Sequence, residues 1–278
     1  MSKLTLCAFS DEADPRLDGQ IQALLDNGIT HMEIRGVDGK NISELTAAEA
    51  QEIRRRLDAA GLTVWSIGSP TGKIRIDAPF MPHLESFKHM LELAGILGAS
   101  HYRLFSFYGT DGSLDWETAV LERLDVFIRS AEGSGIILCH ENEKGLYGDT
   151  VERCWRIAKQ MPKLKLIFDP ANFIQCGEDV TEAWQTLKPY VEYLHIKDAK
   201  ADKTIVLAGE GAGHIPDILA EFAAIGGGTV TLEPHLYEFD GLKGLEELGN
   251  TSHIDANHYQ SPRAAFDTAV TALKRFIE

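Results

Sequence analysis

Eight short apolar runs alternate with segments of helical periodicity along this chain of 278 residues, and this alternation most constrains its fold. The runs are rich in β-branched residues and cover residues 4–10, 31–35, 62–67, 101–107, 136–141, 165–169, 191–195 and 229–233. Between them apolar residues recur at helical spacing, and glycines such as Gly28, Gly61 and Gly98 end the helical patterns. Alternating strands and helices predict a parallel sheet. Eight such units predict an α/β fold that is a single closed (β/α)₈ TIM barrel.

The domain organisation follows from the same pattern. No linker rich in proline or serine and no shift in composition divides the chain, so we predict one domain over residues 1–278. The least regular stretch is 236–262, between the last strand and the last helix. Long loops in compact domains are usually functional, so we expect this one beside the barrel mouth, as a lid or an oligomer contact.

Composition and charge narrow the classes of partner. A formal charge of −15 and a pI near 5.1 argue against binding nucleic acid or an anionic membrane surface. No apolar run reaches the length of a bilayer span, and the amino terminus passes into a polar turn without a signal peptide. The four cysteines form no CxxC pair, which indicates reduced thiols. We therefore expect a cytoplasmic protein.

Four polar residues stand where the last four predicted strands end. Glu141, Asp169, His195 and Glu233 are 28, 26 and 38 residues apart, close to the length of a strand-plus-helix unit. Such barrels carry their reactive groups at the carboxyl ends of the strands. Three carboxylates and one imidazole suit Mn²⁺, Mg²⁺ or Co²⁺, and Zn²⁺ also accepts them. Each acid alone could be a helix N-cap or a loop charge, but the set predicts one divalent metal site.

A metal held by two glutamates indicates a particular reaction. A metal that chelates a carbonyl oxygen and a neighbouring hydroxyl oxygen acidifies the adjacent C–H bond. Glu141 and Glu233 could then flank the substrate carbon, one removing the proton and the other returning it. Return to the opposite face gives epimerisation, and return to the neighbouring carbon gives aldose–ketose isomerisation. Both pass through an enediolate that the metal stabilises.

The strand ends also carry a family resemblance that extends over nearly the whole chain. The segments are His140-Glu141-Asn142, Phe168-Asp169-Pro170-Ala171-Asn172, His195-Ile196-Lys197-Asp198 with the later Gly209-Glu210-Gly211, and Leu232-Glu233-Pro234-His235. They resemble the ligand-bearing strand ends of the xylose isomerase-like TIM-barrel superfamily of sugar phosphate isomerases and epimerases. The resemblance implies the four polar residues as ligands of one divalent ion, with Mn²⁺ the first choice. It also implies the two glutamates as the acid/base pair and a carbohydrate as substrate.

One position departs from the family pattern. In the ketose 3-epimerases of this superfamily a histidine that helps to hold the substrate follows three places after the metal aspartate. Asn172 stands there in this chain, and its amide can form hydrogen bonds but cannot titrate. The identity of the sugar, and whether it is phosphorylated, therefore stay open.

Several cationic side chains fall at or just past the predicted strand ends: Arg35, Lys73, Arg103 and Lys197. In an acidic chain they predict a local pocket for a phosphate or carboxylate. The alternative is that the two arginines pair with loop acids such as Asp11 or Glu12. Lys197 is the strongest of the four, because it lies two residues past His195 and shares its strand face.

The remaining predicted substrate contacts are weaker. His235 shares the strand face of Glu233, whereas His140 should point away from Glu141 by strand alternation. Glu210 could cap the mouth or simply form a turn. Further substrate contacts are predicted at Asn172, and at Phe107 and Tyr108 as an apolar wall. The segment 68–74 is one residue short of a nucleotide P-loop and lacks its Ser or Thr, so we predict a substrate loop with Lys73 as its contact.

Three other functions compete with an isomerase or epimerase. A lyase acting on an inosose-type or keto-sugar substrate needs the same proton abstraction followed by loss of a hydroxyl. An endonuclease IV-like repair enzyme needs more metals, more histidine ligands and a basic surface. A non-catalytic sugar-binding module would be expected to lose a ligand, and all four are present. We also expect a homo-oligomer, a dimer or tetramer, built through loops around the mouth.

Overall fold

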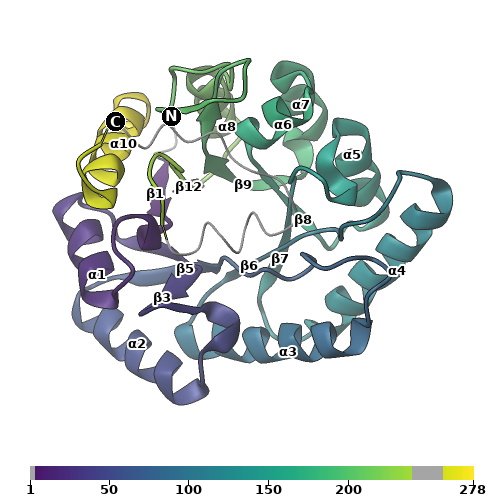
Figure 1. Cartoon of the computed structure of the whole chain (residues 1–278), viewed down its shortest axis with the longest axis horizontal. Helices are drawn as coiled ribbons and strands as arrows, with labels where there is room; N and C mark the ends of the chain where they lie inside the picture. The colour runs from purple at the N-terminus through teal and green to yellow at the C-terminus, as the bar shows by residue number, and fades with distance from the viewer. Residues whose placement is uncertain (1–3, 240–258) are drawn as a thin grey trace.

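A computed structural model describes residues 4–239 and 259–278, and its centre is a closed barrel of parallel strands (Figure 1). The barrel strands are β1 (Thr5–Ala8), β2 (His31–Ile34), β5 (Thr63–Ile67), β6 (His101–Leu104), β7 (Ile137–Glu141), β8 (Lys165–Phe168), β9 (Val191–Ile196) and β12 (Thr229–Leu232). They pair in the order β1-β12-β9-β8-β7-β6-β5-β2, and β1 also pairs with β2. The predicted (β/α)₈ fold is thereby confirmed.

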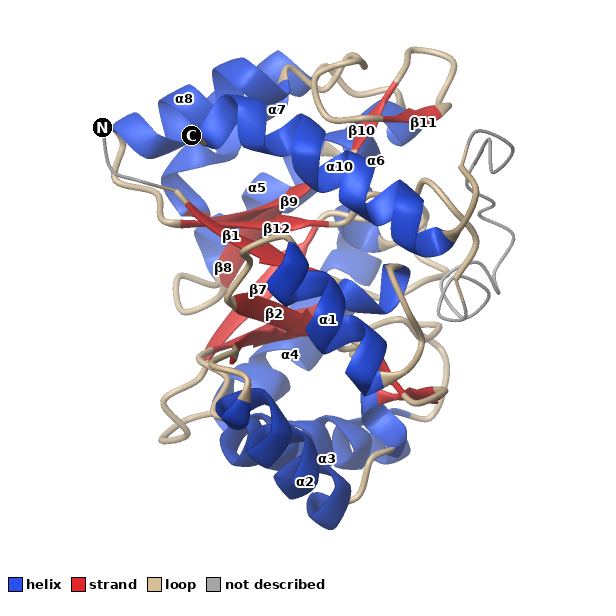
Figure 2. Cartoon of the chain, turned by 90° about the vertical axis from the view of Figure 1, so that its left-hand side faces the viewer, coloured by secondary structure: helices blue, strands red, loops and turns tan. Residues whose placement is uncertain are grey.

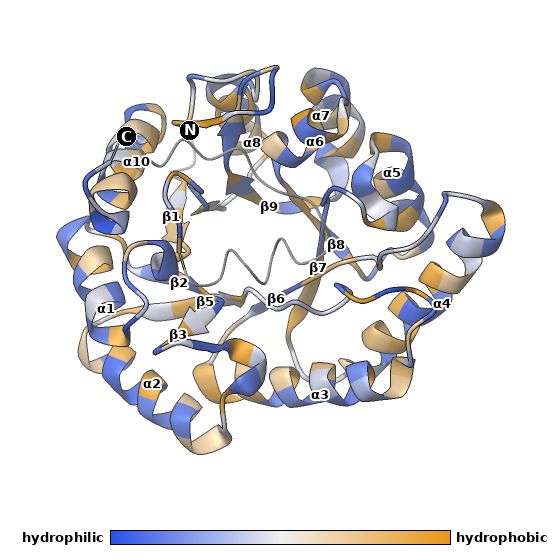
Figure 3. Cartoon of the chain, in the orientation of Figure 1, coloured by the Kyte–Doolittle hydropathy of each residue, from blue (hydrophilic) through white to orange (hydrophobic). Residues whose placement is uncertain are grey.

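Helices surround the barrel (Figures 1 and 2). They are α1 (Leu17–Asp26), α2 (Ala47–Ala59), α3 (Phe80–Leu97), α4 (Leu114–Ser130), α5 (Val151–Gln160), α6 (Pro170–Cys176), α7 (Val180–Leu187), α8 (Ile215–Ala224) and α10 (Pro262–Ile277). Short 3₁₀ turns are η1 (Ser10–Glu12), η2 (Ile42–Glu44), η3 (Tyr147–Asp149) and η4 (Lys188–Tyr190). The helices mix hydrophobic and hydrophilic residues (Figure 3), and in α3 the buried positions Phe87, Met90 and Ala94 share one side.

The chain adds small elements to the expected pattern. Two-stranded sheets form between β3 (Gly36–Val37) and β4 (Lys40–Asn41), and between β10 (Asp198–Ala199) and β11 (Ile205–Val206). Asp38 and Gly39, between β3 and β4, both have positive φ, as an Asp-Gly hairpin turn requires. Helix α6 begins directly after Asp169, with Pro170 in its first turn, and α7 follows it before β9.

The barrel interior is layered. Cys139, Ile167 and Tyr193 form a small apolar cluster inside the barrel, separate from the large core between strands and helices. Each lies two residues before a polar residue at a strand end, so the polar residues share the inward face one step nearer the carboxyl end. The interior therefore changes from apolar to polar toward that end.

Residues 240–258, which make up most of the predicted lid or oligomer contact, lie outside the described residues. In the part of the chain that the structure describes, no helix is both long and apolar enough to cross a membrane.

His83 on α3 makes stability depend on pH. Its Nε2 accepts a hydrogen bond from the Gly72 backbone N–H at 2.7 Å, which requires a neutral ring. Burial, with a smaller contribution from Arg123, lowers the pKa of His83 to about 4. As the pH falls from about 6.5 toward 4, the unfolded chain takes up a proton that the folded chain refuses, so stability is present above this window and is lost within it.

We expect the unfolding free energy of the wild type to fall by about 1 to 2 kcal/mol more than that of His83→Gln between pH 7 and 4.5. Urea denaturation at several pH values measures this difference. His214→Asn, at an exposed position, is the matched control and should follow the wild type. Equal pH dependence of wild type and His83→Gln would contradict the assignment.

Candidate active site

The four polar residues predicted from strand ends converge at the carboxyl end of the barrel. Glu141 ends β7, Asp169 follows β8, His195 lies in β9 and Glu233 follows β12. These strands are neighbours in the barrel, and one ligand atom from each residue lies within 4.8 Å of the others. Each side chain is almost completely buried. The sequence-derived set is therefore one compact cluster, which we call the carboxylate cluster.

Two asparagines lock the ends of β7 and β8 together. The Asn142 side chain accepts a hydrogen bond from the Asp169 backbone N–H and donates one to the Asp169 carbonyl, both at 2.9 Å. The Asn172 side-chain amide donates to the Asn142 carbonyl at 2.9 Å and approaches Glu141 Oε1 at 3.5 Å. Through these two contacts the Asn172 amide helps to orient Glu141.

Asp169 combines two roles that the sequence left as alternatives. Its Oδ1 accepts a hydrogen bond from the Asn172 backbone N–H at 3.0 Å, so it is the N-cap of α6. Its Oδ2 remains turned toward the cluster. Burial raises the pKa of Asp169 to about 6, with Lys197 opposing and Glu141 and Glu233 adding to the rise.

The residues present fit a divalent ion. One ligand atom from each of the four residues lies within 4.8 Å of the others, near twice a metal–ligand bond of about 2.1 Å. Three carboxylates and an imidazole are also a donor set that such ions accept. Asp169 Oδ2 and Glu233 Oε2 are buried and face Lys197 Nζ, at 2.8 and 3.5 Å. The cluster therefore has both the spacing and the donor atoms of a metal site.

Two buried arginines balance the glutamates. Arg35 donates to Asp11 at 2.9 Å, to Glu12 at 3.2 Å and to Glu233 at 2.8 Å. Arg103 donates to Glu141 at 3.1 Å and, through its other nitrogens, to the carbonyls of Gly68 and Ser69. Pairing with Asp11 and Glu12, one of the two sequence-based alternatives, therefore holds for Arg35. Arg103 pairs instead with a residue of the carboxylate cluster.

Two lysines are also paired. Lys197 Nζ lies 2.8 Å from Asp169 Oδ2 and 3.5 Å from Glu233 Oε2. Burial alone would lower the pKa of Lys197, but Asp169 and Glu233 raise it above its usual value. Lys73 donates to Glu143 at 2.9 Å, and its Nζ lies 4.3 Å from the centre of the Phe105 ring. Each of the four predicted cationic side chains is therefore paired with at least one carboxylate.

His235 lies beside the cluster, on the face expected from Glu233. Its backbone N–H donates to Glu12 at 2.7 Å, and its Nε2 lies 3.3 Å from Glu233 and 3.5 Å from Glu12. Glu12, Glu233 and His235 form a second group with metal-ligand spacing. This second group has three members where the carboxylate cluster has four, and it shares Glu233 with that cluster, so the carboxylate cluster remains the candidate metal site.

Other predicted contacts are placed elsewhere. Phe107 is fully buried with positive φ and stacks on Phe127 of α4, so its ring belongs to the packing between barrel and helices. Glu210 is exposed in a turn. As substrate contacts, both stay predictions. Tyr108 packs with Phe105, whose ring lies beside Lys73, and it stays a predicted substrate contact.

His140 lies away from the cluster, as strand alternation predicts. It is fully buried, and its ring faces Gly148, where a Cβ would come within 2.5 Å of it. Burial lowers its pKa to about 3, so it is neutral.

Sequence reasoning missed two acids of the site. Glu33 on β2 lies 3.1 Å from His195 Nε2, and Glu143 pairs with Lys73. The signal for Glu33 was present, since it stands between the apolar residues Met32 and Ile34 of a predicted strand. Glu143 lies in a polar loop, where an acid carries no such signal.

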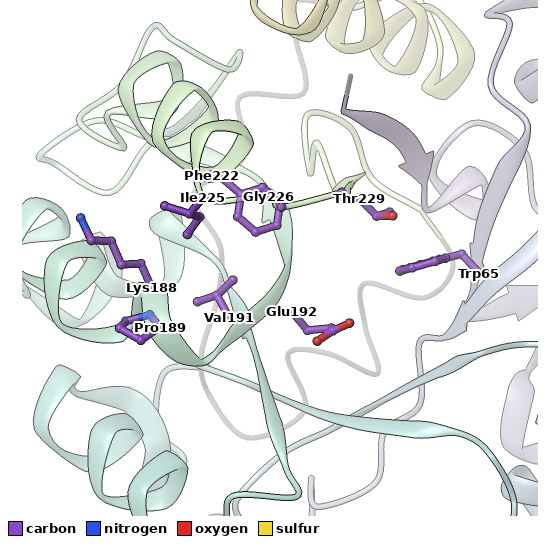
Figure 4. Close-up of a pocket in the computed structure, with 11 residues that line it drawn as sticks. Trp65, Lys188, Pro189, Val191, Glu192, Phe222, Ile225, Gly226 and Thr229 are labelled. Atoms are coloured by element: carbon purple, nitrogen blue, oxygen red, sulfur yellow. The ribbon is translucent and has the colours of Figure 1, made fainter. Parts of the chain in front are cut away.

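A hollow of about 670 Å³ lies at the opposite end of the barrel (Figure 4). It is lined by residues that precede or begin the strands, among them Trp65, Lys188, Glu192 and Thr229. None of the four cluster residues lines it. The chemistry of the carboxylate cluster, and not the size of this hollow, therefore defines the candidate active site.

Comparison with known proteins identifies the class to which this fold and site belong. The model of the xylose isomerase-like TIM-barrel family matches residues 21–252, so the chain is a member of that family. The protein YihM of Escherichia coli (strain K12), which is uncharacterized, is 27% identical over 224 residues. That match covers 76% of this chain and 62% of YihM, so the chain spans less than two thirds of this relative.

Solved structures share the whole fold at low sequence identity. D-psicose 3-epimerase from Clostridium cellulolyticum H10, crystallised with D-tagatose, aligns with a TM-score of 0.75 at 15% identity, over 99% of this chain and 100% of its own. The probable 3-DHS dehydratase AsbF from Bacillus anthracis gives 0.73 at 16%, over 98% of both chains. IolI, with a bound zinc atom, gives 0.73 at 15%, over 98% and 99%. At these identities the likeness establishes the fold.

Arg35→Met tests how far the site depends on its cations. The variant leaves Asp11, Glu12 and Glu233 without their shared partner in a buried setting, so we expect a loss of about 3 to 5 kcal/mol in unfolding free energy. Urea denaturation measures the loss. Arg75→Met, which removes an exposed pair with Asp77, is the matched control and should leave stability almost unchanged. Equal effects of the two variants would refute the role given to Arg35.

Proposed function

We propose that this protein is a divalent-metal-dependent enzyme that isomerises or epimerises a sugar or related keto-sugar. The observation that carries the proposal is the convergence of Glu141, Asp169, His195 and Glu233 within 4.8 Å at the carboxyl end of the barrel. Family membership and the fold shared with a D-psicose 3-epimerase support a carbohydrate substrate. The zinc in IolI supports a divalent ion, with Mn²⁺ still the first choice and Mg²⁺, Co²⁺ or Zn²⁺ as alternatives.

The four cluster residues would hold the ion, which supplies Lewis acidity that lowers the pKa of the C–H bond beside the substrate carbonyl. The two glutamates are suited to move the proton. Both reach the same side of His195, with Nδ1 at 3.0 Å from Glu141 and 3.6 Å from Glu233. One carboxylate removes the proton to give an enediolate and the other returns it.

The remaining polar groups position the reactants. Lys197, between Asp169 and Glu233, is placed to bind a substrate oxygen, and Arg103 holds Glu141 in the site. Burial of the cluster excludes water, which strengthens each of these charge interactions.

A dehydratase is the second candidate. It would use the same proton abstraction and then expel a hydroxyl group, so the same glutamates and metal would serve it. The fold shared with AsbF supports this alternative. Product mass decides between the two, because isomerisation and epimerisation preserve the mass of the sugar and dehydration removes one water.

Glu141→Gln tests the proposed acid/base pair. With metal-loaded protein, keto-sugars and D₂O, we expect deuterium to enter the carbon beside the carbonyl in the wild type. We expect the variant to exchange about 10² to 10⁴ times more slowly, as loss of a general base predicts. Mass spectrometry of recovered sugar measures the exchange. Glu182→Gln, at an exposed position on α7, is the control. Unchanged exchange in Glu141→Gln would exclude the proposed mechanism.

The charge of the site favours an uncharged sugar over a sugar phosphate. Linked groups, all buried or half-buried, comprise seven carboxylates (Asp11, Glu12, Glu33, Glu141, Glu143, Asp169, Glu233) and four cations (Arg35, Lys73, Arg103, Lys197). Their excess of three negative charges exceeds the charge of one divalent ion bound through a neutral His195. A phosphate dianion would therefore enter a site without surplus positive charge.

Glu143→Gln tests this charge balance, because it frees Lys73 without touching the carboxylate cluster. We expect the affinity for D-fructose 6-phosphate, relative to D-fructose, to rise about tenfold, the effect of one partly buried charge. Isothermal titration of metal-loaded protein with both sugars measures the ratio. Glu178→Gln, in the segment before α7, is the control. Tighter binding of the phosphate than of the free sugar by the wild type would contradict the inference.

A further inference from the structure

The ring of His195 is held by a carboxylate at each nitrogen. Nδ1 lies 3.0 Å from Glu141 Oε1, inside the carboxylate cluster, and Nε2 lies 3.1 Å from Glu33 Oε2, on the far side of the ring. His195 and Glu33 are both fully buried. Phe9 and Tyr193 pack edge-on against the imidazole, at 5.3 and 5.5 Å between ring centres. The ring therefore has a defined orientation, with one nitrogen directed at each carboxylate.

Glu33 is itself fixed from the opposite wall of the barrel. Its second oxygen, Oε1, accepts a hydrogen bond from the Tyr193 hydroxyl at 3.0 Å, and that hydroxyl lies 3.1 Å from Ser66 Oγ. The pairing of β2 with β5 shifts register between Met32 and Glu33. Such irregularities re-aim a side chain and are frequent beside active sites. Two oxygens with two separate partners leave Glu33 little freedom to move.

This arrangement determines which nitrogen of His195 can bind a cation. A metal takes the lone pair of an unprotonated ring nitrogen. Glu141 also lies 3.0 Å from Nδ1, so both nitrogens can carry a proton while no ion is bound. An ion among Glu141, Asp169 and Glu233 would replace the proton on Nδ1, the nitrogen that faces them, and Glu33 would keep the remaining proton on Nε2. Without the Glu33 carboxylate, that proton and the orientation of the ring would be less firmly held.

We propose that Glu33 is a positioning residue that holds His195 with Nε2 protonated and Nδ1 presented to the metal. This inference rests on the proposed metal site, and it adds a residue that does not itself touch the ion or the substrate. Loss of such a partner typically weakens metal binding by about 10- to 100-fold.

Glu33→Gln tests the proposal, with Glu182→Gln, at an exposed position on α7, as the matched control. Glutamine has nearly the same size as glutamate, but it is neutral and its amide can either donate to Nε2 or accept from it. Titration calorimetry with Zn²⁺ should show affinity about 10- to 100-fold weaker for Glu33→Gln and nearly unchanged for Glu182→Gln.

Nitrogen-15 NMR of the zinc-loaded wild type gives a readout that does not depend on the variant folding. We expect the His195 proton on Nε2, and a proton on Nδ1 would overturn the proposal. Unchanged zinc affinity in Glu33→Gln would also overturn it, while leaving the metal site in place. If the wild type binds none of Mn²⁺, Mg²⁺, Co²⁺ and Zn²⁺, the proposed function fails. The Glu33–His195 pair is then tested in metal-free protein, where slow solvent exchange of the Nε2 proton supports it and fast exchange overturns it.

Discussion

The buried negative charge at one end of the barrel is the constraint on which the rest of the site depends. Carboxylates forced together away from water repel one another, and they are tolerated only with cations and hydrogen bonds beside them. Arg35 meets this need for three acids at once, and Arg103 and Lys197 meet it for the carboxylate cluster. The contacts that compensate this charge therefore also hold the carboxylates of the candidate site in place.

The barrel makes this concentration of charge possible. Closure of the sheet leaves no edge, and inward-facing positions on every strand meet at one rim. One layer below, Cys139, Ile167 and Tyr193 seal the interior with apolar surface. The polar rim is thus backed by a dry layer, which keeps its charge interactions strong. The polar network extends into that layer. The Tyr193 hydroxyl donates a hydrogen bond to Glu33, and Glu33 contacts His195 Nε2.

Two residues of the candidate site, Asp169 and Asn172, also stabilise the fold around it. Asp169 caps α6 with one oxygen and offers the other to the cluster, so the helix start also orients a proposed ligand. The Asn172 side chain donates to the Asn142 carbonyl and so links α6, which follows β8, to the end of β7. These side chains serve both the fold and the candidate site, so their positions are fixed. Functional sites generally accept some loss of stability for a fixed geometry.

The sequence by itself determined the repeating strand–helix units and the four polar residues at strand ends. It could do so because parallel strands of one barrel end at one rim, so sequence period alone predicts proximity. Only the tertiary structure decided the partners across the barrel. Glu33 reaches His195 through a register shift in β2, and the positive φ of Phe107 belongs to a ring packed outward against α4. Such contacts depend on closure and local backbone geometry, which no short-range sequence pattern encodes.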